Sequence, residues 1–173
     1  MSFDRTFDEG AKFRVCFVCT GNICRSPMAE VIFRHLITTA GLGHSLDVIS
    51  AGTGDWHVGE RADDRTLEAL SSRGFDGSAQ RARQFDPEWF DKLDLVVAFD
   101  RGQERILTSW AQTDEARSKV QLLLNFDKEA QVLDVPDPYY SDAAMFDQVL
   151  TMILRATTAL FNQITPGIPQ GEP

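Results

Sequence analysis

Four short apolar runs alternate with stretches of helical pattern along this chain of 173 residues, and this alternation limits the possible folds more than any other feature. Each run is rich in β-branched, aromatic and other apolar residues, as is typical of buried strands. Strands separated by helices indicate right-handed crossovers between parallel neighbours. The sequence therefore predicts an α/β fold of three layers, a four-stranded parallel sheet with helices on both faces. The predicted strands are FRVCFVC from residue 13, LDVISAG from residue 46, LDLVVAFD from residue 93 and VQLLL from residue 120.

Capping signals mark where the helices between these strands begin and end. Pro27 suits a first helical turn and Gly41 suits a helix end, so we expect a helix between them. Asp63 is placed to cap a second helix, and Ser141 or Asp142 to cap the last one. The last helix has apolar residues at helical spacing, which predicts one face packed on the sheet.

The length and the 43% hydrophobic content suit one domain with a single well-buried core. Residues 1–12 are acidic and polar, and the chain ends in PGIPQGEP, which is rich in proline and glycine. We therefore expect flexible tails at 1–12 and 165–173 on either side of a domain at 13–164.

The charge balance excludes some classes of partner. The chain has 17 Lys and Arg against 26 Asp and Glu, a net charge of −9, which argues against general affinity for nucleic acids or lipid phosphates. No apolar run approaches the roughly 20 residues of a membrane span, and the N-terminus lacks the pattern of a signal peptide. We expect a cytoplasmic protein without membrane insertion, although export without a signal stays open.

All three cysteines of the chain, Cys16, Cys19 and Cys24, lie within nine positions, where the first predicted strand turns into a helix. An odd number of cysteines crowded at one turn suits chemistry better than disulfide architecture. Cys19 is followed after five residues by Arg25 and then by Ser26. Ligands of parallel sheets bind at the carboxyl ends of the strands, which is where this turn lies.

The turn has the residues of an anion-binding loop. Backbone N–H groups at a helix N-terminus bind anions, and Gly21 and Asn22 tolerate the unusual backbone angles of a tightly wound loop. Arg25 offers paired donors that fit two phosphate oxygens, with Cys19 facing the phosphorus. A nucleophilic cysteine must be a thiolate, and the Ser26 hydroxyl and the loop N–H groups are donors that stabilise one.

The segment FVCTGNICRSPMAE resembles the active-site loop of the low-molecular-weight protein-tyrosine phosphatases, and is most similar to their bacterial branch. The resemblance spans about residues 13 to 163. It continues through SAGTGDWHVG, RARQF, AFDRG and DPYY, in the order in which the family has them.

The resemblance implies hydrolysis of phosphotyrosine in proteins through a cysteinyl-phosphate intermediate. It implies that Cys19 is the nucleophile, that Arg25 binds the phosphate, and that Asp137 is the general acid and then the base. It implies no cofactor and no metal, because Arg25 and the loop N–H groups supply the positive field. The other phosphate-binding residues would be Thr20, Gly21, Asn22, Ile23, Cys24 and Ser26.

Further residues match supporting positions of the family. Trp56, Tyr139 and Tyr140 match aromatic walls of the pocket, which favour a phosphorylated ring over a short phosphoserine. Ser50 matches a residue that supports the loop by hydrogen bonding. Cys24 matches a cysteine that pairs with the nucleophile under oxidation. The expected partners are phosphotyrosine-containing proteins, and we expect a monomer.

The chain departs from the family pattern at two positions, Gln80 in place of a histidine and Ser141 in place of a glycine. The first change predicts a weaker support for the loop asparagine or one made differently, and the second a stiffer or shifted acid loop. Asp100 and Arg101 are expected at the rim or in the support of the site.

Alternative interpretations were weighed for the cysteines and for the function. The C-x-x-C spacing of Cys16 and Cys19 suits a redox or zinc site poorly, since Cys16 lies inside a strand and no histidine has ligand spacing. An arsenate reductase would need relay cysteines after Cys24. A protein-arginine phosphatase carries threonine at the position of Ile23. A phosphopeptide-binding module would have lost catalytic residues that are all present.

Overall fold

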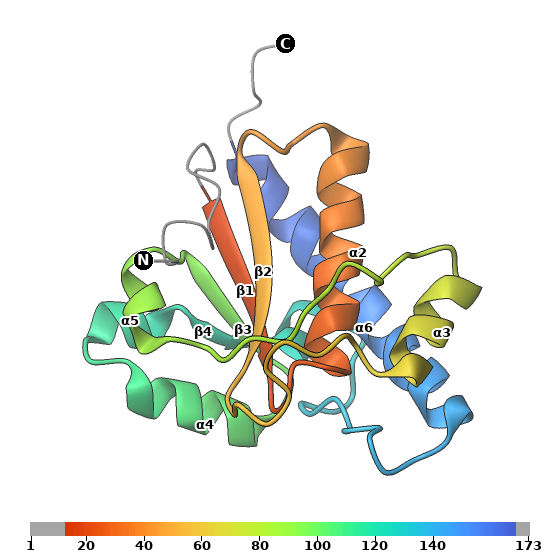
Figure 1. Cartoon of the computed structure of the whole chain (residues 1–173). Helices are drawn as coiled ribbons and strands as arrows, with labels where there is room; N and C mark the ends of the chain where they lie inside the picture. Colours follow the sequence, from red (N-terminus) through yellow and green to blue (C-terminus); the bar gives the residue numbers. More distant parts are fainter. Residues whose placement is uncertain (1–12, 169–173) are drawn as a thin grey trace.

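The computed structural model describes residues 13–168 of the chain, and its centre is a parallel sheet of four strands. The strands β1 (Phe13–Cys19), β2 (Leu46–Gly52), β3 (Leu95–Ala98) and β4 (Val120–Leu122) lie in the order β2-β1-β3-β4 (Figure 1). All three pairings are parallel. The predicted fold class is therefore confirmed, and each of the four strands lies within or coincides with a predicted run.

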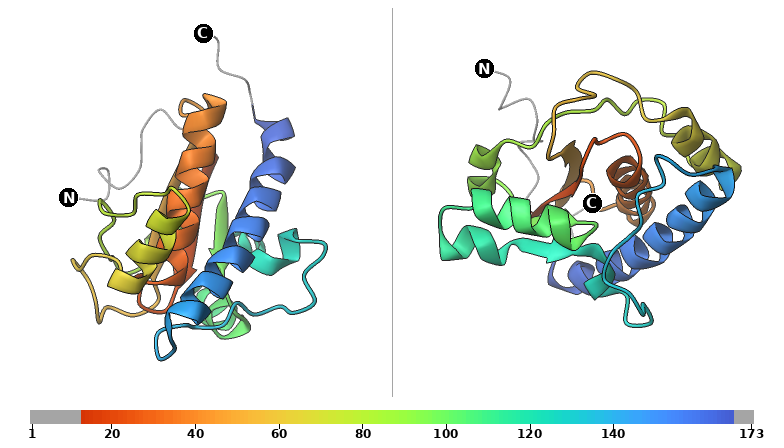
Figure 2. Two further views of the ribbon diagram at one scale, coloured as in Figure 1. Left: turned by 90° about the vertical axis from the view of Figure 1, so that its right-hand side faces the viewer. Right: turned by 90° about the horizontal axis from the view of Figure 1, so that it is seen from below.

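Helices cover both faces of the sheet, and the chain has a separate apolar cluster on each face (Figure 2). One face carries the long helices α2 (Arg25–Ala40) and α6 (Ala143–Ile164) together with α3 (Asp64–Ser72). The other face carries α4 (Arg101–Trp110), α5 (Asp114–Ser118) and the 3₁₀ turn η1 (Pro87–Asp91). Two further 3₁₀ turns are η2 (Leu123–Phe126) and η3 (Thr165–Gly167). No helix within residues 13–168 is long and apolar enough to cross a bilayer.

Aromatic side chains fill both clusters. Under α2 and α6, Phe33 meets Phe17 and Phe161 edge to face, with ring centroids 5.6 Å apart in each pair. On the opposite face, Phe85 packs against Trp89 at 5.4 Å and against Trp110 at 6.4 Å. Such pairs are worth about 0.5–1.5 kcal/mol each beyond the apolar area that they bury. The two tryptophans therefore serve packing.

Strand β1 is the point where the direction of the chain across the sheet reverses. The chain leaves β1 for β2 on one side and later returns to β3 on the other side. Cys19 ends β1, in register with Gly52 at the end of β2. The carboxyl edge of a parallel sheet at such a reversal is open to a ligand. The fold thus puts the cysteine loop at the position where ligands of α/β sheets bind.

The predicted helix ends are found with small adjustments. Gly41 ends α2 in the left-handed conformation with φ 70°. The Asp63 carboxylate accepts the N–H of Arg65 at the start of α3, and the Asp142 carboxylate accepts the N–H of Met145 at the start of α6. Of the two residues predicted to cap the last helix, Asp142 is therefore the one that does so.

The predicted C-terminal tail at 165–173 begins too early. Thr165–Gly167 form the turn η3, and the N–H of Ile168 donates to the carbonyl of Thr165 at 3.0 Å. Ile168 is buried against the cluster under α6. Proline and glycine here shape a tight turn, and the apolar side chain that follows returns to the core. The predictions for residues 1–12 and 169–173 fall outside the described residues.

The Asp63–Arg65 pair predicts a pH-dependent contribution to stability. Burial alone would raise the pKa of Asp63, but hydrogen bonds from Arg65 outweigh it and hold the pKa below its ordinary value of 3.8. The stabilisation is thus present above the unfolded pKa and is lost as the pH falls through the folded one. Asp63→Asn keeps a capping side chain but removes the charge. We expect a free energy of unfolding lower by up to about 1 kcal/mol at pH 6, with no difference near pH 2.

Urea unfolding at a series of pH values measures this difference. Asp64→Asn is the matched control, because Asp64 is the next residue and its side chain is 92% exposed. A difference between wild type and Asp63→Asn that stays constant down to pH 2 would contradict the assignment.

Candidate active site

The loop from Cys19 to Arg25 forms the floor of a pocket of about 420 Å³. Asn22 has φ 57°, and no other residue except glycine has a positive φ in the described part of the chain. The expectation of an unusual backbone angle is thus confirmed for Asn22. It is wrong for Gly21, which is absent from the glycines of positive φ. A Cβ on Gly21 would lie 3.0 Å from Cδ2 of the His57 side chain, a tight contact that a larger residue makes only if His57 moves slightly.

A second close approach fixes the path of the loop. A Cβ on Gly52 would lie 2.7 Å from the carbonyl oxygen of Thr20, closer than real Cβ contacts allow. The backbones of β2 and the loop also bond directly, with the N–H of Thr53 donating to the carbonyl of Cys19 at 2.8 Å. Gly52 therefore positions the loop. In the sequence, the glycine of the segment SAG (50–52) is the only indication of this role.

The sulfur of Cys19 lies among hydrogen-bond donors. Its Sγ is 2.9 Å from Oγ of Ser26 and 3.4 Å from the Ser26 backbone N. Asn22 donates from Nδ2 to the same Ser26 Oγ at 2.7 Å, so the hydroxyl accepts that bond and keeps its own hydrogen for another acceptor. The closer of the two acceptors in reach is the sulfur, since the carbonyl of Ala51 is 3.4 Å away. The arrangement suits a thiolate.

The loop is supported from behind by Ser50. Its Oγ donates to Oε1 of Glu30 at 2.6 Å and accepts from Nδ2 of Asn22 at 2.9 Å. Gln80 donates from Nε2 to the same Ser50 oxygen at 3.0 Å and only distantly, at 3.5 Å, to Oδ1 of Asn22. The departure at Gln80 therefore gives a support made mainly through Ser50, as the expectation of a different support suggests.

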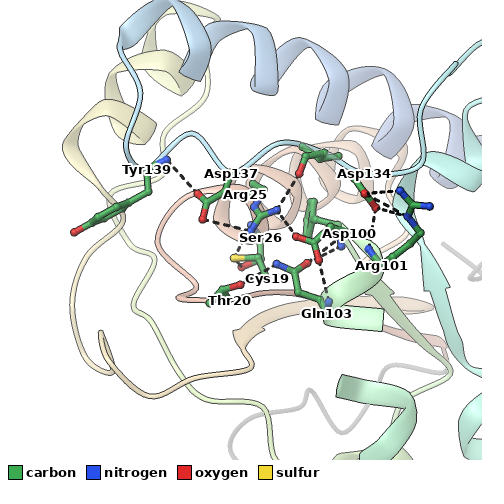
Figure 3. A network of polar contacts seen from close by, with 12 residues as sticks. Cys19, Thr20, Arg25, Ser26, Asp100, Arg101, Gln103, Asp134, Asp137 and Tyr139 are labelled. Carbon is green, nitrogen blue, oxygen red and sulfur yellow. Dashed lines mark hydrogen bonds and ion pairs between the residues drawn. The ribbon is translucent and has the colours of Figure 1, made fainter. Parts of the chain in front are cut away.

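The guanidinium of Arg25 is buried and is held by three oxygens (Figure 3). Its Nη1 donates to Oδ2 of Asp100 at 2.8 Å and to the carbonyl of Val135 at 2.9 Å. On the other side, its Nη2 lies 3.7 Å from Oδ2 of Asp137. The structure thus brings Cys19, Arg25 and Asp137 to one pocket. It also adds Asp100, which the sequence placed only at the rim or in the support.

Asp100 is fixed by its own helix. It caps α4 by accepting the N–H of Gln103, while Oε1 of Gln103 accepts the N–H of Asp100, which together form a capping box. Gln103 is buried, and its Nε2 also donates to Oγ1 of Thr20 in the loop at 3.1 Å. The same cap therefore anchors both the arginine and the loop.

A second ion pair fixes the segment that carries the Val135 carbonyl. The Arg101 guanidinium binds Asp134 with an N–O distance of 3.0 Å and lowers the pKa of that carboxyl below its ordinary value. Arg101 thus supports the site from outside the pocket.

The loop that carries Asp137 is anchored on the side of α3. Oδ1 of Asp137 accepts the N–H of Tyr139 at 3.1 Å, which leaves Oδ2 directed to Arg25. The carbonyl of Ser141 accepts from Nη1 of Arg65 at 3.0 Å, and the Ser141 N–H donates to the carbonyl of Pro138 at 2.8 Å. Both hydrogen bonds at Ser141 are made by its backbone. The turn therefore does not depend on the side chain that this residue has in place of the family's glycine.

Aromatic residues form the wall of the pocket, as predicted for Trp56, Tyr139 and Tyr140. The rings of Tyr139 and Tyr140 meet edge to face with centroids 4.9 Å apart. His57 also lines the pocket, with Nδ1 2.8 Å from Oε2 of Glu60. The exposed fractions of 68% for Trp56 and 94% for Tyr140 place these two rings at the mouth.

The other two cysteines are buried and free. Burial raises the pKa of Cys16 well above its ordinary value, which suits a small core residue on β1. Burial also raises the pKa of Cys24, to about 12, so this thiol is protonated at neutral pH. No cluster of three His, Cys, Asp or Glu side chains that would hold a metal ion exists among residues 13–168.

Comparisons with known proteins give the same family throughout. The sequence model of the family described as "Low molecular weight phosphotyrosine protein phosphatase" matches residues 14–167. A low molecular weight protein-tyrosine-phosphatase of Streptomyces coelicolor is 51% identical, over 86% of this chain and 91% of that protein. The low molecular weight protein-tyrosine phosphatase A of Mycobacterium tuberculosis is 40% identical, over 92% of this chain and 96% of that protein. The crystal structure of YfkJ from Bacillus subtilis has a TM-score of 0.84 at 36% identity, over 92% of this chain and 99% of that one.

Two substitutions of Asp100 separate its charge from its orienting role. Asp100→Asn keeps an acceptor for Arg25 and a good helix cap, and it makes the pocket more positive. We expect it to bind inorganic phosphate at least as tightly as wild type. Asp100→Ala removes a hydrogen bond between charged groups, worth about 1.5–3 kcal/mol. We expect phosphate binding about 10- to 100-fold weaker, measured by calorimetry.

Asp142→Ala is the control for the loss of a helix cap. It removes the cap of α6 but leaves Asp100, which binds Arg25, unchanged. It should lower stability by about 1 kcal/mol without weakening phosphate binding. Equal weakening in Asp100→Asn and Asp100→Ala would contradict the orienting role.

Proposed function

The chain belongs to the low molecular weight phosphotyrosine protein phosphatase family, and on that premise we propose that Cys19, Arg25 and Asp137 carry out the hydrolysis of phosphotyrosine. The observation that carries the proposal is the convergence of these three side chains on one pocket, with Cys19 at its floor and aromatic residues around it. The donors on the Cys19 sulfur and the ion pairs of Arg25 support the roles given below.

The first step is attack of the Cys19 thiolate on the phosphorus of the substrate. A bond from sulfur to phosphorus forms while the bond from phosphorus to the phenolic oxygen breaks. Asp137 gives its proton to the departing phenolate, and Arg25 with the loop N–H groups stabilises the charge on the phosphoryl oxygens. The 3.7 Å between Asp137 and Arg25 supports this role, because it puts the carboxyl at the edge of the phosphate position.

The second step returns the enzyme to its starting state. Asp137, now without its proton, accepts one from a water molecule that attacks the phosphorus of the cysteinyl-phosphate. The bond between phosphorus and sulfur breaks, and inorganic phosphate leaves with Cys19 again a thiolate. The exposed fraction of 49% for the Asp137 side chain supports this step, since water has access to the carboxyl.

The pocket wall supports an aryl phosphate as the substrate group. Trp56, Tyr139 and Tyr140 offer ring faces and edges for a phosphorylated ring, and a pocket floor formed by Cys19 favours a long side chain. Ile23 also lines the pocket, where a protein-arginine phosphatase has threonine. An apolar side chain there leaves no hydroxyl to bond a guanidinium nitrogen, so phosphotyrosine is favoured.

Phosphoproteins are thus the substrates that the family implies, and three finer expectations stay proposals. They are a cytoplasmic location, a monomeric state and a reaction that needs no cofactor. Three free thiols suit the reducing conditions of a cytoplasm.

Substitution of the nucleophile and of the acid tests the mechanism with aryl phosphates. Cys19→Ser should abolish turnover, because a serine hydroxyl is not ionised at neutral pH. Asp137→Asn should lower kcat/KM, which reports the step in which the phenol leaves, by about 10²- to 10⁴-fold for phenyl phosphate and by less for a nitrophenyl phosphate, whose leaving group needs no proton. Steady-state kinetics measures both effects.

Cys16→Ala and Asp142→Asn are the matched controls and should keep turnover near that of wild type. Retained turnover in Cys19→Ser would refute the assignment of Cys19 as the nucleophile. An equal loss of kcat/KM on both esters in Asp137→Asn would refute the assignment of Asp137 as the general acid. Faster hydrolysis of phosphoarginine than of the aryl esters by wild type would favour the arginine phosphatase instead.

We also propose that Cys24 protects Cys19 from oxidation. Peroxide converts the Cys19 thiolate to a sulfenic acid, and the Cys24 sulfur then displaces its hydroxyl as water to form a disulfide. The raised pKa of Cys24 keeps the attacking thiolate scarce, so disulfide formation should speed up as the pH rises.

Peroxide treatment at pH 7 and pH 9 tests this protection. Wild type should regain activity on reduction by dithiothreitol, and more fully at pH 9, whereas Cys24→Ser should stay inactive. Mass spectrometry should find Cys19 joined to Cys24. Equal recovery of wild type and Cys24→Ser, or Cys16 as the partner, would contradict the proposal.

A further inference from the structure

A second depression lies behind the catalytic loop, between the outer face of α2 and the segment 74–83 that follows α3. Figure 1 shows this segment crossing in front of α2. The depression has a volume of about 670 Å³ and shares no lining residue with the catalytic pocket. We call it the rear groove. Its charged lining residues are Glu30, Arg34, Asp76, Arg81 and Arg83.

The rear groove is positive in a chain whose net charge is −9. Three arginines stand against two carboxylates among its lining residues. Both carboxylates already have partners. Glu30 accepts from Ser50 and Arg34, and Asp76 accepts the backbone N–H of Ser78. The excess positive charge of the groove is therefore not neutralised locally.

Two of the arginines have no carboxylate partner. The Arg83 guanidinium makes no hydrogen bond or ion pair within residues 13–168, although it is only partly exposed. Arg81 donates only to the carbonyls of Ser78 and Gln80. Residues 81 and 83 follow an extended path, with buried Gln80 and Ala82 at the alternate positions. Alternation puts both arginine side chains on the same, outer face.

We propose that the rear groove is a second anion site, which binds the phosphate group of a small organic phosphate. Arg81 and Arg83 are the phosphate ligands, because a guanidinium without a carboxylate presents its donors to two phosphate oxygens. The groove is far larger than one phosphate group. Val31 and Phe75 line it as apolar surface, and the Phe75 ring lies edge to face with His35 at 5.3 Å. The organic part of the ligand packs there.

A ligand in the rear groove would act on the catalytic loop through two residues that line the groove. Gln80 and Glu30 line the groove, and both hydrogen-bond to Oγ of Ser50, which accepts from Asn22. The backbone N–H of Arg83 donates to Oδ1 of Asn22 at 3.0 Å. Occupancy therefore reaches Asn22 and the loop through adjoining hydrogen bonds, and coupling between the two sites must be reciprocal.

A ¹H–¹⁵N NMR titration with inorganic phosphate tests the site at constant ionic strength, with chloride as the replaced anion. We expect two groups of amides to shift with different dissociation constants, Gly21 and Cys24 in the loop and Gly77 and Ala79 at the groove. Arg83→Gln should weaken the second dissociation constant at least tenfold and keep the first. Arg105→Gln removes the same charge at an exposed position of α4 and should change neither dissociation constant.

The loop amides report the catalytic site in the same spectra, so failure of the rear groove is distinguishable from failure of the proposed function. Groove amides that do not shift would overturn the second site. Groove shifts that follow the dissociation constant of the loop and persist in Arg83→Gln would also overturn it. Phenylphosphonate should bind the groove at least threefold more tightly than methylphosphonate. Equal affinities would refute the proposal that the organic part of the ligand packs in the groove.

Inhibition kinetics tests the coupling. At the catalytic site, phosphate competes with the substrate phosphoryl group, so this site alone gives purely competitive inhibition of aryl phosphate hydrolysis. Occupancy of the rear groove adds an effect on kcat. We expect wild type and Arg105→Gln to show mixed inhibition and Arg83→Gln to show the competitive component alone. Purely competitive inhibition of wild type would refute coupling between the rear groove and the loop.

Discussion

The direction of one chain of hydrogen bonds determines what the rest of the site can do. A carboxylate only accepts, so Glu30 obliges the Ser50 hydroxyl to donate to it. Ser50 can then only accept from Asn22, and Asn22 uses its second N–H on Ser26. Ser26 is left with its hydrogen free for Cys19. The partly buried carboxylate of Glu30 in α2 thus directs a proton toward the Cys19 sulfur through the three residues between them. The left-handed backbone of Asn22, at φ 57°, fits the loop conformation in which its amide reaches both serines.

Arg25 poses the opposite problem, since a buried guanidinium must be paired or it destabilises the fold by several kcal/mol. Two carboxylates at unequal distances share the task. Asp100 is close at 2.8 Å and is fixed by the cap of α4, whereas Asp137 is 3.7 Å away in a loop and half exposed. The close pair satisfies the charge in the folded protein. The looser carboxylate is accessible to solvent, and its loop is held by bonds that do not involve its Oδ2.

The residue pattern by itself predicts the parts of the site that are local in the chain, whereas distant parts such as Asp137 and Ser50 are predicted only through the family resemblance. The turn from Cys19 to Ser26 carries its function in adjacent residues, so its position at the end of β1 follows from the strand and helix patterns. Asp100 and the carbonyl of Val135 contact Arg25 across 75 and 110 residues, and neither has a local signal for this role. Gly52 is needed because the carbonyl oxygen of Thr20 lies 2.7 Å from where the Cβ of another residue would be.

Gln80 shows how a departure from the family pattern changes physical behaviour while keeping the geometry. A histidine at this position donates or accepts according to its tautomer, and it titrates near neutral pH. The amide of Gln80 donates from Nε2 to Ser50 at every pH, so it adds to the direction that Glu30 imposes. Neither Ser50 nor Gln80, the two side chains that bond Asn22 and each other here, titrates between about pH 5 and 8. Gln80 also lines the rear groove, so the amide that donates to Ser50 links the support of the loop to that surface.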